Sequence, residues 1–207
     1  PLVNNARNGK ILPGEPGRVA LNKGVHLLDV PGGPVDRSQG DVHPLGNPHY
    51  LLNPENGLVA AKTITDALTA LDAAHAGDYE VNAKRFKEQM DRKIIEWTGA
   101  LAPYRGTMVM SYHKTFDYFI ERYGFVLVGT VEPKPGVEPS PTHVSHLVTK
   151  NKGAGIKLLL VEPSRPLKTP AYIGQALGLK VIVLPELVGG TPGAKRSEEH
   201  TSELQSH

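Results

Sequence analysis

The residues best suited to chemistry in this chain are histidines and carboxylates, because the sequence has nine histidines and no cysteine. Without thiols, a disulfide framework, a redox dithiol and a thiolate metal site are excluded, so any metal must be held by imidazole and carboxylate groups. His43 and His49 lie in GDVHPLGNPHYLLNP, where prolines, glycines and asparagines disfavour a regular helix or strand. Such a segment could hold a ring nitrogen toward a ligand or be an ordinary surface loop, and the spacing alone leaves both open.

Other candidates stand at the ends of predicted strands. His113 directly follows TMVMSY and opens a predicted helix, and Glu186 follows the last predicted strand in VIVLPELVGG. Ligands of parallel α/β sheets bind at the carboxyl ends of the strands, so both side chains are expected to face one crevice. The alternatives are a helix-capping role for His113 and a solvated loop position for Glu186. Glu132 and Glu162 also follow predicted strands, so position singles out no one carboxylate.

A parallel α/β domain is predicted to position these strand ends. Four short aliphatic runs read as buried parallel strands; they are TMVMSY (107–112), FVLVGTV (125–131), IKLLLVE (156–162) and KVIVL (180–184). The segments between them have helical character and each closes with glycine, as C-caps do; they are 114–124, 142–155 and 169–178. Strand and helix alternate throughout, which is the pattern of a parallel α/β fold.

The amino-terminal half predicts two helices after a loop-rich start. Asn53 and Pro54 supply helix-start chemistry for PENGLVAAKTITDALTALD, whose apolar residues recur at helical spacing. A longer helix is predicted over 78–101, with one apolar stripe and a length above roughly 30 Å. Residues 1–40 are rich in Gly, Pro and Asn and predict loops with one short strand, GVHLLDV (24–30).

Composition excludes several classes of protein. The chain has 207 residues and 39% hydrophobic residues, and it contains no run long enough for a membrane-spanning helix. A net charge of +2 argues against a nucleic-acid partner. The sequence contains no HExxH, GxSxG, P-loop or GxGxxG motif after a strand. His143 and His146 are spaced i, i+3 and could bind a metal as a pair or form a polar helix face.

Three ordered segments resemble the ZnuA/TroA-like solute-binding proteins of zinc and manganese ABC importers, which are periplasmic or surface-anchored. NPHYLLNPENG is similar to that family's DPHYWLDP segment, SYHKTFDYFIERYGF to its second histidine block, and PKPGVEPSPTHVSHL to its Pro-Gly-Glu-Pro-Ser segment. The match runs from about Asn5 to Ala194 in the right order. The resemblance therefore covers most of the chain.

The resemblance implies an α/β fold of two lobes joined by a long rigid helix, with metal in the cleft between them. Residues 1–71 would form an incomplete amino-terminal lobe, 72–102 the linking helix, and 103–195 the carboxy-terminal α/β lobe. Residues 196–207, RSEEHTSELQSH, resemble the translation of a sequencing adapter and are expected to be non-native. The chain is therefore expected to be truncated at both ends, with targeting information missing because it does not begin with Met.

The resemblance also implies a ligand set. His49 matches the ligand of the amino-terminal lobe, His113 the ligand that opens the carboxy-terminal lobe, and Glu186 the final carboxylate, although this segment departs from the family's aspartate. A further histidine is expected upstream of the chain. His43 could substitute locally but matches no family motif.

The function implied is capture of Zn²⁺, with Mn²⁺ as the alternative, in the periplasm or on the extracytoplasmic face of the membrane. Imidazole at His113 favours zinc, whereas a carboxylate there would favour manganese. The partner would be the membrane permease of an ABC importer, the protein would be a monomer, and it would catalyse no reaction. Two alternatives are a metal-dependent α/β hydrolase using His49 and His113, and a metal-free domain that binds an organic solute.

Overall fold

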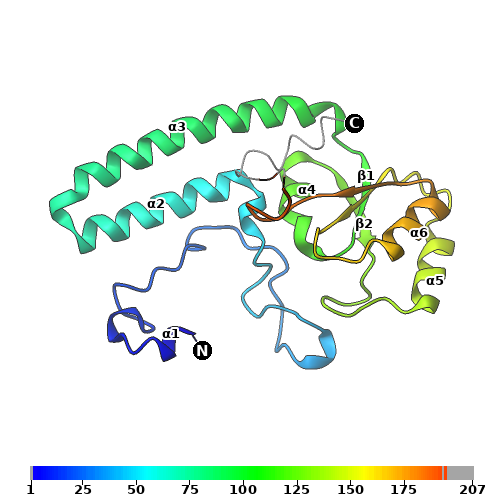
Figure 1. Cartoon of the computed structure of the whole chain (residues 1–207), viewed down its shortest axis with the longest axis horizontal. Coiled ribbons are helices and arrows are strands. Elements are labelled where there is room, and N and C mark those ends of the chain that lie inside the picture. The colour runs from blue at the N-terminus through cyan, green and yellow to red at the C-terminus, as the bar shows by residue number, and fades with distance from the viewer. Residues whose placement is uncertain (1, 193, 195–207) are drawn as a thin grey trace. The chain divides into compact units, whose positions relative to one another are not determined.

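The computed structural model describes residues 2–192 and residue 194, which divide into two compact units (Figure 1). The first unit holds the described residues of Pro1–His26 and Asn53–Ile95, and the second those of Leu27–Leu52 and Glu96–His207. The predicted adapter-like tail, 196–207, lies outside the described residues. The arrangement of two lobes about a linking helix stays a prediction.

The second unit is built on a parallel sheet, which confirms the predicted α/β class. Its strands are β1 (Met108–Ser111), β2 (Val126–Thr130), β3 (Leu158–Val161) and β4 (Lys180–Val183), in the spatial order β2-β1-β3-β4. All three neighbouring pairs are parallel. Since parallel strands point the same way, their carboxyl ends share one edge of the sheet, as the sequence predicted.

Helices connect the strands in the predicted alternation. They are α4 (Asp117–Tyr123), preceded by a 3-10 turn at Lys114–Phe116, α5 (Pro141–Asn151) and α6 (Lys168–Leu177). Gly124 and Gly178 end α4 and α6 with φ of 72° and 68°. A left-handed residue at this position caps the final carbonyls, and glycine adopts it without steric cost.

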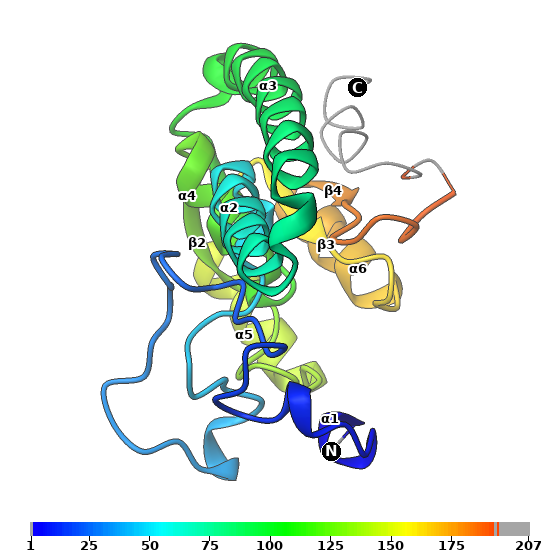
Figure 2. The ribbon, with the colours of Figure 1, turned by 90° about the vertical axis from the view of Figure 1, so that its left-hand side faces the viewer.

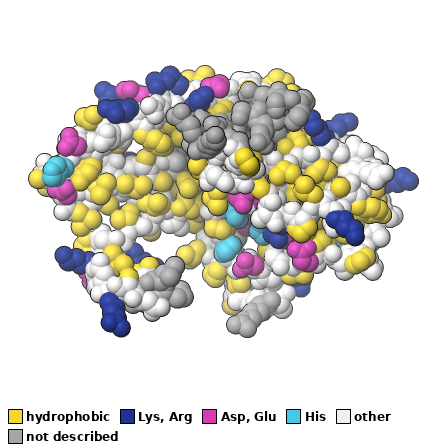
Figure 3. Space-filling model, in the orientation of Figure 1, with side chains coloured by type: hydrophobic (Ala, Val, Ile, Leu, Met, Phe, Trp, Pro, Cys, Tyr) yellow, Lys and Arg dark blue, Asp and Glu magenta, His cyan; other side chains and the backbone are white. Residues whose placement is uncertain are grey.

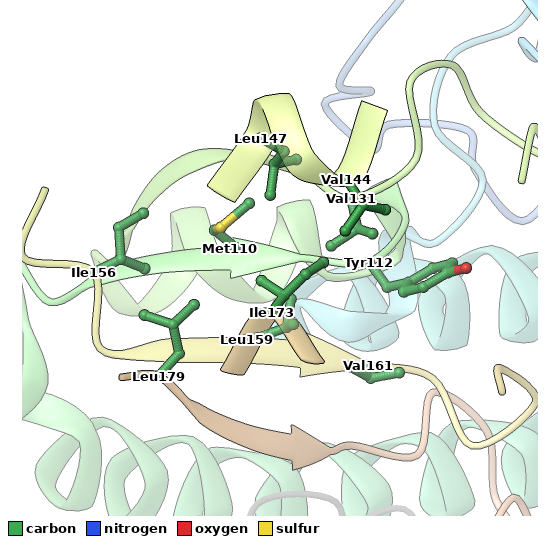
Figure 4. Packing of buried hydrophobic residues seen from close by; sticks show 10 residues of the cluster. All are labelled: Met110, Tyr112, Val131, Val144, Leu147, Ile156, Leu159, Val161, Ile173 and Leu179. Carbon is green, nitrogen blue, oxygen red and sulfur yellow. The ribbon is translucent and has the colours of Figure 1, made fainter. Parts of the chain in front are cut away.

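One apolar core lies where α5 and α6 pack on the sheet (Figure 4). Leu159 and Val161 of β3 and Ile173 of α6 are fully buried, and Val144 and Leu147 of α5 close the cluster. β3 lies inside the sheet between β1 and β4, so it contacts neighbours on both edges. This packing therefore fixes the carboxyl ends of the strands relative to one another.

The first unit contains two helices that run side by side (Figures 1 and 2). They are α2 (Pro54–Leu71) and α3 (Ala76–Leu101). The last residues of α3, from Glu96 on, belong to the second unit. Asn53 caps α2 by accepting a hydrogen bond from the amide of Glu55. Apolar side chains are exposed along both helices, as Figure 3 shows. None of the described helices combines the length and apolarity that crossing a membrane requires.

The prediction of a strand at 24–30 is wrong. This stretch forms turns and bends, because its backbone pairs with side chains and loop residues rather than with a neighbouring strand. The amide of Leu28 donates to the Tyr118 hydroxyl, and the Leu28 carbonyl accepts from the amide of Asn47. The backbone of Leu28 thus anchors a loop here.

Candidate metal centre

The structure brings the two predicted histidine ligands together within the second unit. The ring centroids of His49 and His113 are 5.9 Å apart, with the ring planes at 84°. Both side chains line one pocket of about 500 Å³, whose walls include Asp29, Asn47 and Lys114. Figure 3 shows histidine side chains reaching the surface close to acidic ones. Two residues far apart in the sequence therefore present imidazoles to the same space.

His113 is held at the end of β1. It directly precedes the 3-10 turn at Lys114–Phe116, as the sequence predicted, and only 15% of its side chain is exposed. Its Nδ1 lies 2.6 Å from Oε2 of Glu132, and its carbonyl accepts a short hydrogen bond from the Ser111 hydroxyl. With Nδ1 engaged, Nε2 is the ring nitrogen left for a ligand.

Of the carboxylates predicted at strand ends, Glu132 is the one that contacts His113. Its side chain is 1% exposed, and its Oε1 lies 2.8 Å from the guanidinium of Arg165. The amide of Gly136 donates to Oε2. Glu162, which the sequence placed at an equivalent strand end, lies 3.9 Å from Arg165, and burial raises the pKa of its carboxyl. Sequence reasoning missed Arg165; its position just after β3 was the available signal.

His49 is held by the loop that precedes α2. The Asn47 side chain accepts from the amide of His49 and donates to the carbonyl of Lys114 and to the carboxylate of Asp29. Burial, together with the smaller contributions of the nearby His113 and His43, lowers the pKa of His49 to about 4. A neutral imidazole is the form that binds a metal.

Tyr118 of α4 ties this loop to the sheet. Its hydroxyl accepts from the amide of Leu28 and donates to the carbonyl of Asn47. An ion pair between Lys114 and Asp29 lies beside it. Burial and a hydrogen bond with Asp29 raise the pKa of Asp117 to about 7.

A second contact closes the loop that carries His43. The amide of Asp41 donates to the carbonyl of Pro135 at 2.7 Å. Gly40 has a φ of +85°, and a Cβ there would lie 2.5 Å from the same carbonyl oxygen. Only glycine permits this approach, so the segment before His43 is held against the loop that follows Glu132.

The remaining candidates have different positions. His43 is exposed and lines the same pocket as His49. Glu186 is half-buried but is not among the described residues that line this pocket, and its assignment as a ligand stays a prediction. The Nε2 of His143 lies 3.0 Å from the carbonyl of Val131, which favours a structural role for that ring. Among the residues that the structure describes, no group of three His, Cys, Asp or Glu side chains is close enough to hold a metal ion.

The arrangement offers two imidazole donors in one pocket. Zinc in proteins is usually four-coordinate, so a bound ion would take further donors besides His49 and His113. A hydrolytic metal site would also need a general base beside the metal-bound water. Among the described residues, the pocket therefore supplies two imidazoles toward such a coordination shell.

Comparison with known proteins places the chain in a family. The family model described as "ZnuA: Zinc-uptake complex component A periplasmic" matches residues 3–201. The high-affinity zinc uptake system protein ZnuA of Brucella abortus is 30% identical over 115 residues, which are 56% of this chain and 34% of that protein. The zinc-binding protein AdcA of Streptococcus pyogenes is 26% identical over 145 residues, 70% of this chain and 28% of that protein. The chain thus spans about a third of the length of these curated relatives.

Solved structures share the fold. A crystal structure of ZnuA has a TM-score of 0.67 at 22% identity, covering 91% of this chain and 65% of that one. The solute-binding protein FpvC of Pseudomonas aeruginosa, in complex with Mn²⁺, has a TM-score of 0.70 at 23% identity, covering 94% and 68%. The family consists of binding proteins, which confirms the prediction of a non-enzyme and speaks against the hydrolase alternative. The chain belongs to the ZnuA family of periplasmic metal-binding solute-binding proteins of ABC importers.

Proposed function

We propose that this protein captures Zn²⁺ outside the cytoplasmic membrane and delivers it, as a monomer, to the permease of an ABC importer. The observation that carries the proposal is the pairing of His49 and His113, with Nδ1 of His113 engaged and Nε2 left for a ligand. Two imidazoles suit zinc better than manganese, which prefers oxygen donors. Relatives in Brucella and Streptococcus are named for zinc, whereas FpvC was crystallised with Mn²⁺ and with Ni²⁺.

The proposed ligand set begins with His49 and His113 and takes its carboxylate from Glu186. One oxygen of the Glu186 carboxylate is buried without a hydrogen-bond partner among the described residues. Buried polar atoms normally have a partner, so this oxygen supports the choice of Glu186 as the carboxylate ligand. Release to a permease would follow if the permease binds the metal-loaded arrangement differently from the empty one.

Zinc calorimetry with a competing chelator tests the proposal. The variants are His49→Ala, His113→Ala and Glu186→Gln, with His75→Ala as a matched control because His75 pairs with Asp72 in the first unit. We expect each of the two histidine variants to lose roughly 100-fold or more in zinc affinity, since each removes a direct donor. A smaller loss is expected for Glu186→Gln and none for the control.

Competition between metals tests the choice of cargo. Titration with Mn²⁺ in place of Zn²⁺ should give weaker binding, because imidazole is a poorer partner for manganese. Unchanged zinc affinity in folded His113→Ala protein would remove His113 from the site, and tighter binding of Mn²⁺ than of Zn²⁺ would overturn the choice of zinc.

A further inference from the structure

We propose that Glu132, clamped by Arg165, is a positioning residue that fixes the tautomer and the ring plane of His113. The inference rests on the proposed function, because it concerns how that site presents one of its donors. It assigns a role to two side chains that would not themselves touch the metal.

The first step is the hydrogen bond at the histidine ring. Nδ1 of His113 lies 2.6 Å from Oε2 of Glu132, a short distance typical of a charge-assisted bond. A carboxylate paired with an arginine can only accept, so Nδ1 carries a proton, and in the neutral ring the lone pair is on Nε2. A partner at the second ring nitrogen is the usual way in which proteins select the nitrogen that binds a metal.

The second step is the restraint on Glu132 itself. Its Oε1 forms an ion pair with Arg165 without hydrogen-bond geometry, whereas its Oε2 accepts from the amide of Gly136 in addition to contacting His113. The side chain is almost fully buried, so water does not compete for these contacts. The carboxylate therefore cannot rotate without losing an ion pair or a hydrogen bond in a buried position, which is costly.

The third step is that Arg165 is itself held in place. Its guanidinium lies over the ring of Tyr112 at 5.2 Å, and Tyr112 is fully buried beside His113 in the chain. Arg165 also lies 3.9 Å from Glu138 and from Glu162. The clamp thus draws on residues that follow β1, β2 and β3.

Glu138 offers a matched control. It contacts the same arginine and accepts from the Tyr112 hydroxyl, yet its side chain is 70% exposed, and none of its hydrogen bonds or ion pairs among the described residues involves His113. A variant at Glu138 therefore changes the charge around Arg165 without touching the histidine. Among the described carboxylates that contact the arginine, Glu132 is the one that also contacts the His113 ring.

Long-range ¹H–¹⁵N spectra of metal-free, ¹⁵N-histidine-labelled protein test the inference directly. Wild-type His113 should show a single tautomer with the proton on Nδ1. In Glu132→Gln the side-chain amide can donate as well as accept, so we expect a mixture of tautomers, and zinc affinity should fall about 10- to 100-fold. Glu138→Gln should leave the tautomer and the affinity unchanged.

The remaining outcomes separate this inference from the function. A folded Glu132→Gln protein with the wild-type tautomer and affinity overturns the positioning role while zinc capture stands. A change of tautomer in a protein whose wild type does not bind zinc defeats the function and leaves the positioning role intact. If Glu132→Gln does not fold, Arg165→Met, at a 24% exposed side chain, supplies the test: an unchanged tautomer and affinity there overturn the clamp.

Discussion

His113 and His49 are presented by regions that are built in different ways. His113 stands at the end of a parallel strand, and its ring is bonded to a buried carboxylate. His49 stands on the irregular loop 27–52, and its ring makes no hydrogen bond to a residue that the structure describes. The loop keeps its place through the Tyr118 hydroxyl of α4 and through its own Asn47 side chain, which donates to the carbonyl of Lys114.

The comparison shows two ways in which a protein can hold a ligating side chain in a defined position. At the strand end, apolar burial and the sheet ladder fix the backbone, and only the ring needs a polar partner. In the loop, the backbone itself needs polar partners, because no ladder pairs its amide and carbonyl groups. We therefore expect damage to the core to affect the whole second unit and damage to the loop contacts to affect His49 first.

The largest effect is expected from truncation in the core of the sheet. Leu159 of β3 is fully buried in the apolar cluster under α5 and α6, so Leu159→Ala leaves a cavity there and should lower the free energy of unfolding by about 2–5 kcal/mol. Urea unfolding followed by fluorescence of Trp97, the single tryptophan, measures it. Leu45→Ala, at a 75% exposed loop side chain, is the control and should change little. An equal loss of unfolding free energy in both variants would contradict the proposed difference between the core of the sheet and the loop.

An intermediate effect is expected at Asp117, where α4 meets the loop. Its pKa is raised from 3.8 to about 7, chiefly by burial and then by the hydrogen bond with Asp29. Between about pH 4 and pH 7 the folded state keeps a proton that the unfolded state releases, so stability contributed by this group falls as pH rises. Asp117→Asn stays neutral, and its stability relative to wild type should rise through this window, by up to about 4 kcal/mol.

Urea unfolding at several pH values between 4 and 8 measures the trend for wild type and Asp117→Asn. The asparagine amide can still donate to Asp29, so the variant retains a hydrogen bond between helix and loop. Parallel stability profiles for the two proteins would show that Asp117 does not hold a proton in the folded state.

The smallest effect is expected at Tyr118. Tyr118→Phe leaves the amide of Leu28 and the carbonyl of Asn47 without their partner, a loss of about 1–3 kcal/mol. Hydrogen exchange should accelerate within 27–52 and stay slow in β1 and β3. Tyr172→Phe, at an exposed position on α6, is the control. Faster exchange in the strands as well would mean that loop and sheet open together.

The sequence predicted the strands and helices well because their signals are local. Aliphatic runs, a glycine after each of α4 and α6, and Asn53 before α2 each act within a few residues. The sequence predicted a loop over most of 27–52, but the path of this loop could not be predicted because it depends on contacts across long stretches of chain, such as Leu28 with Tyr118. The apolar pattern of 24–30 therefore suggested a strand that does not exist.

The candidate site could also be predicted only in part from the sequence. His49 and His113 were found from motifs, and the structure brings them together. Glu132 and Glu162 could not be told apart from the sequence, since both stand at strand ends and their different contacts to His113 and Arg165 arise only on folding. Glu186 follows β4 as predicted but does not line the pocket, and its role as a ligand stays a prediction.

The clamp at His113 also bears on the order of folding. His113, Glu132 and Arg165 follow three successive strands, and parallel strands pair only after the chain has crossed over between them. The histidine can therefore reach its final state only once β3 has docked beside β1, late in a process dominated by distant contacts. A metal that binds this histidine would stabilise the completed sheet and would not accelerate its nucleation.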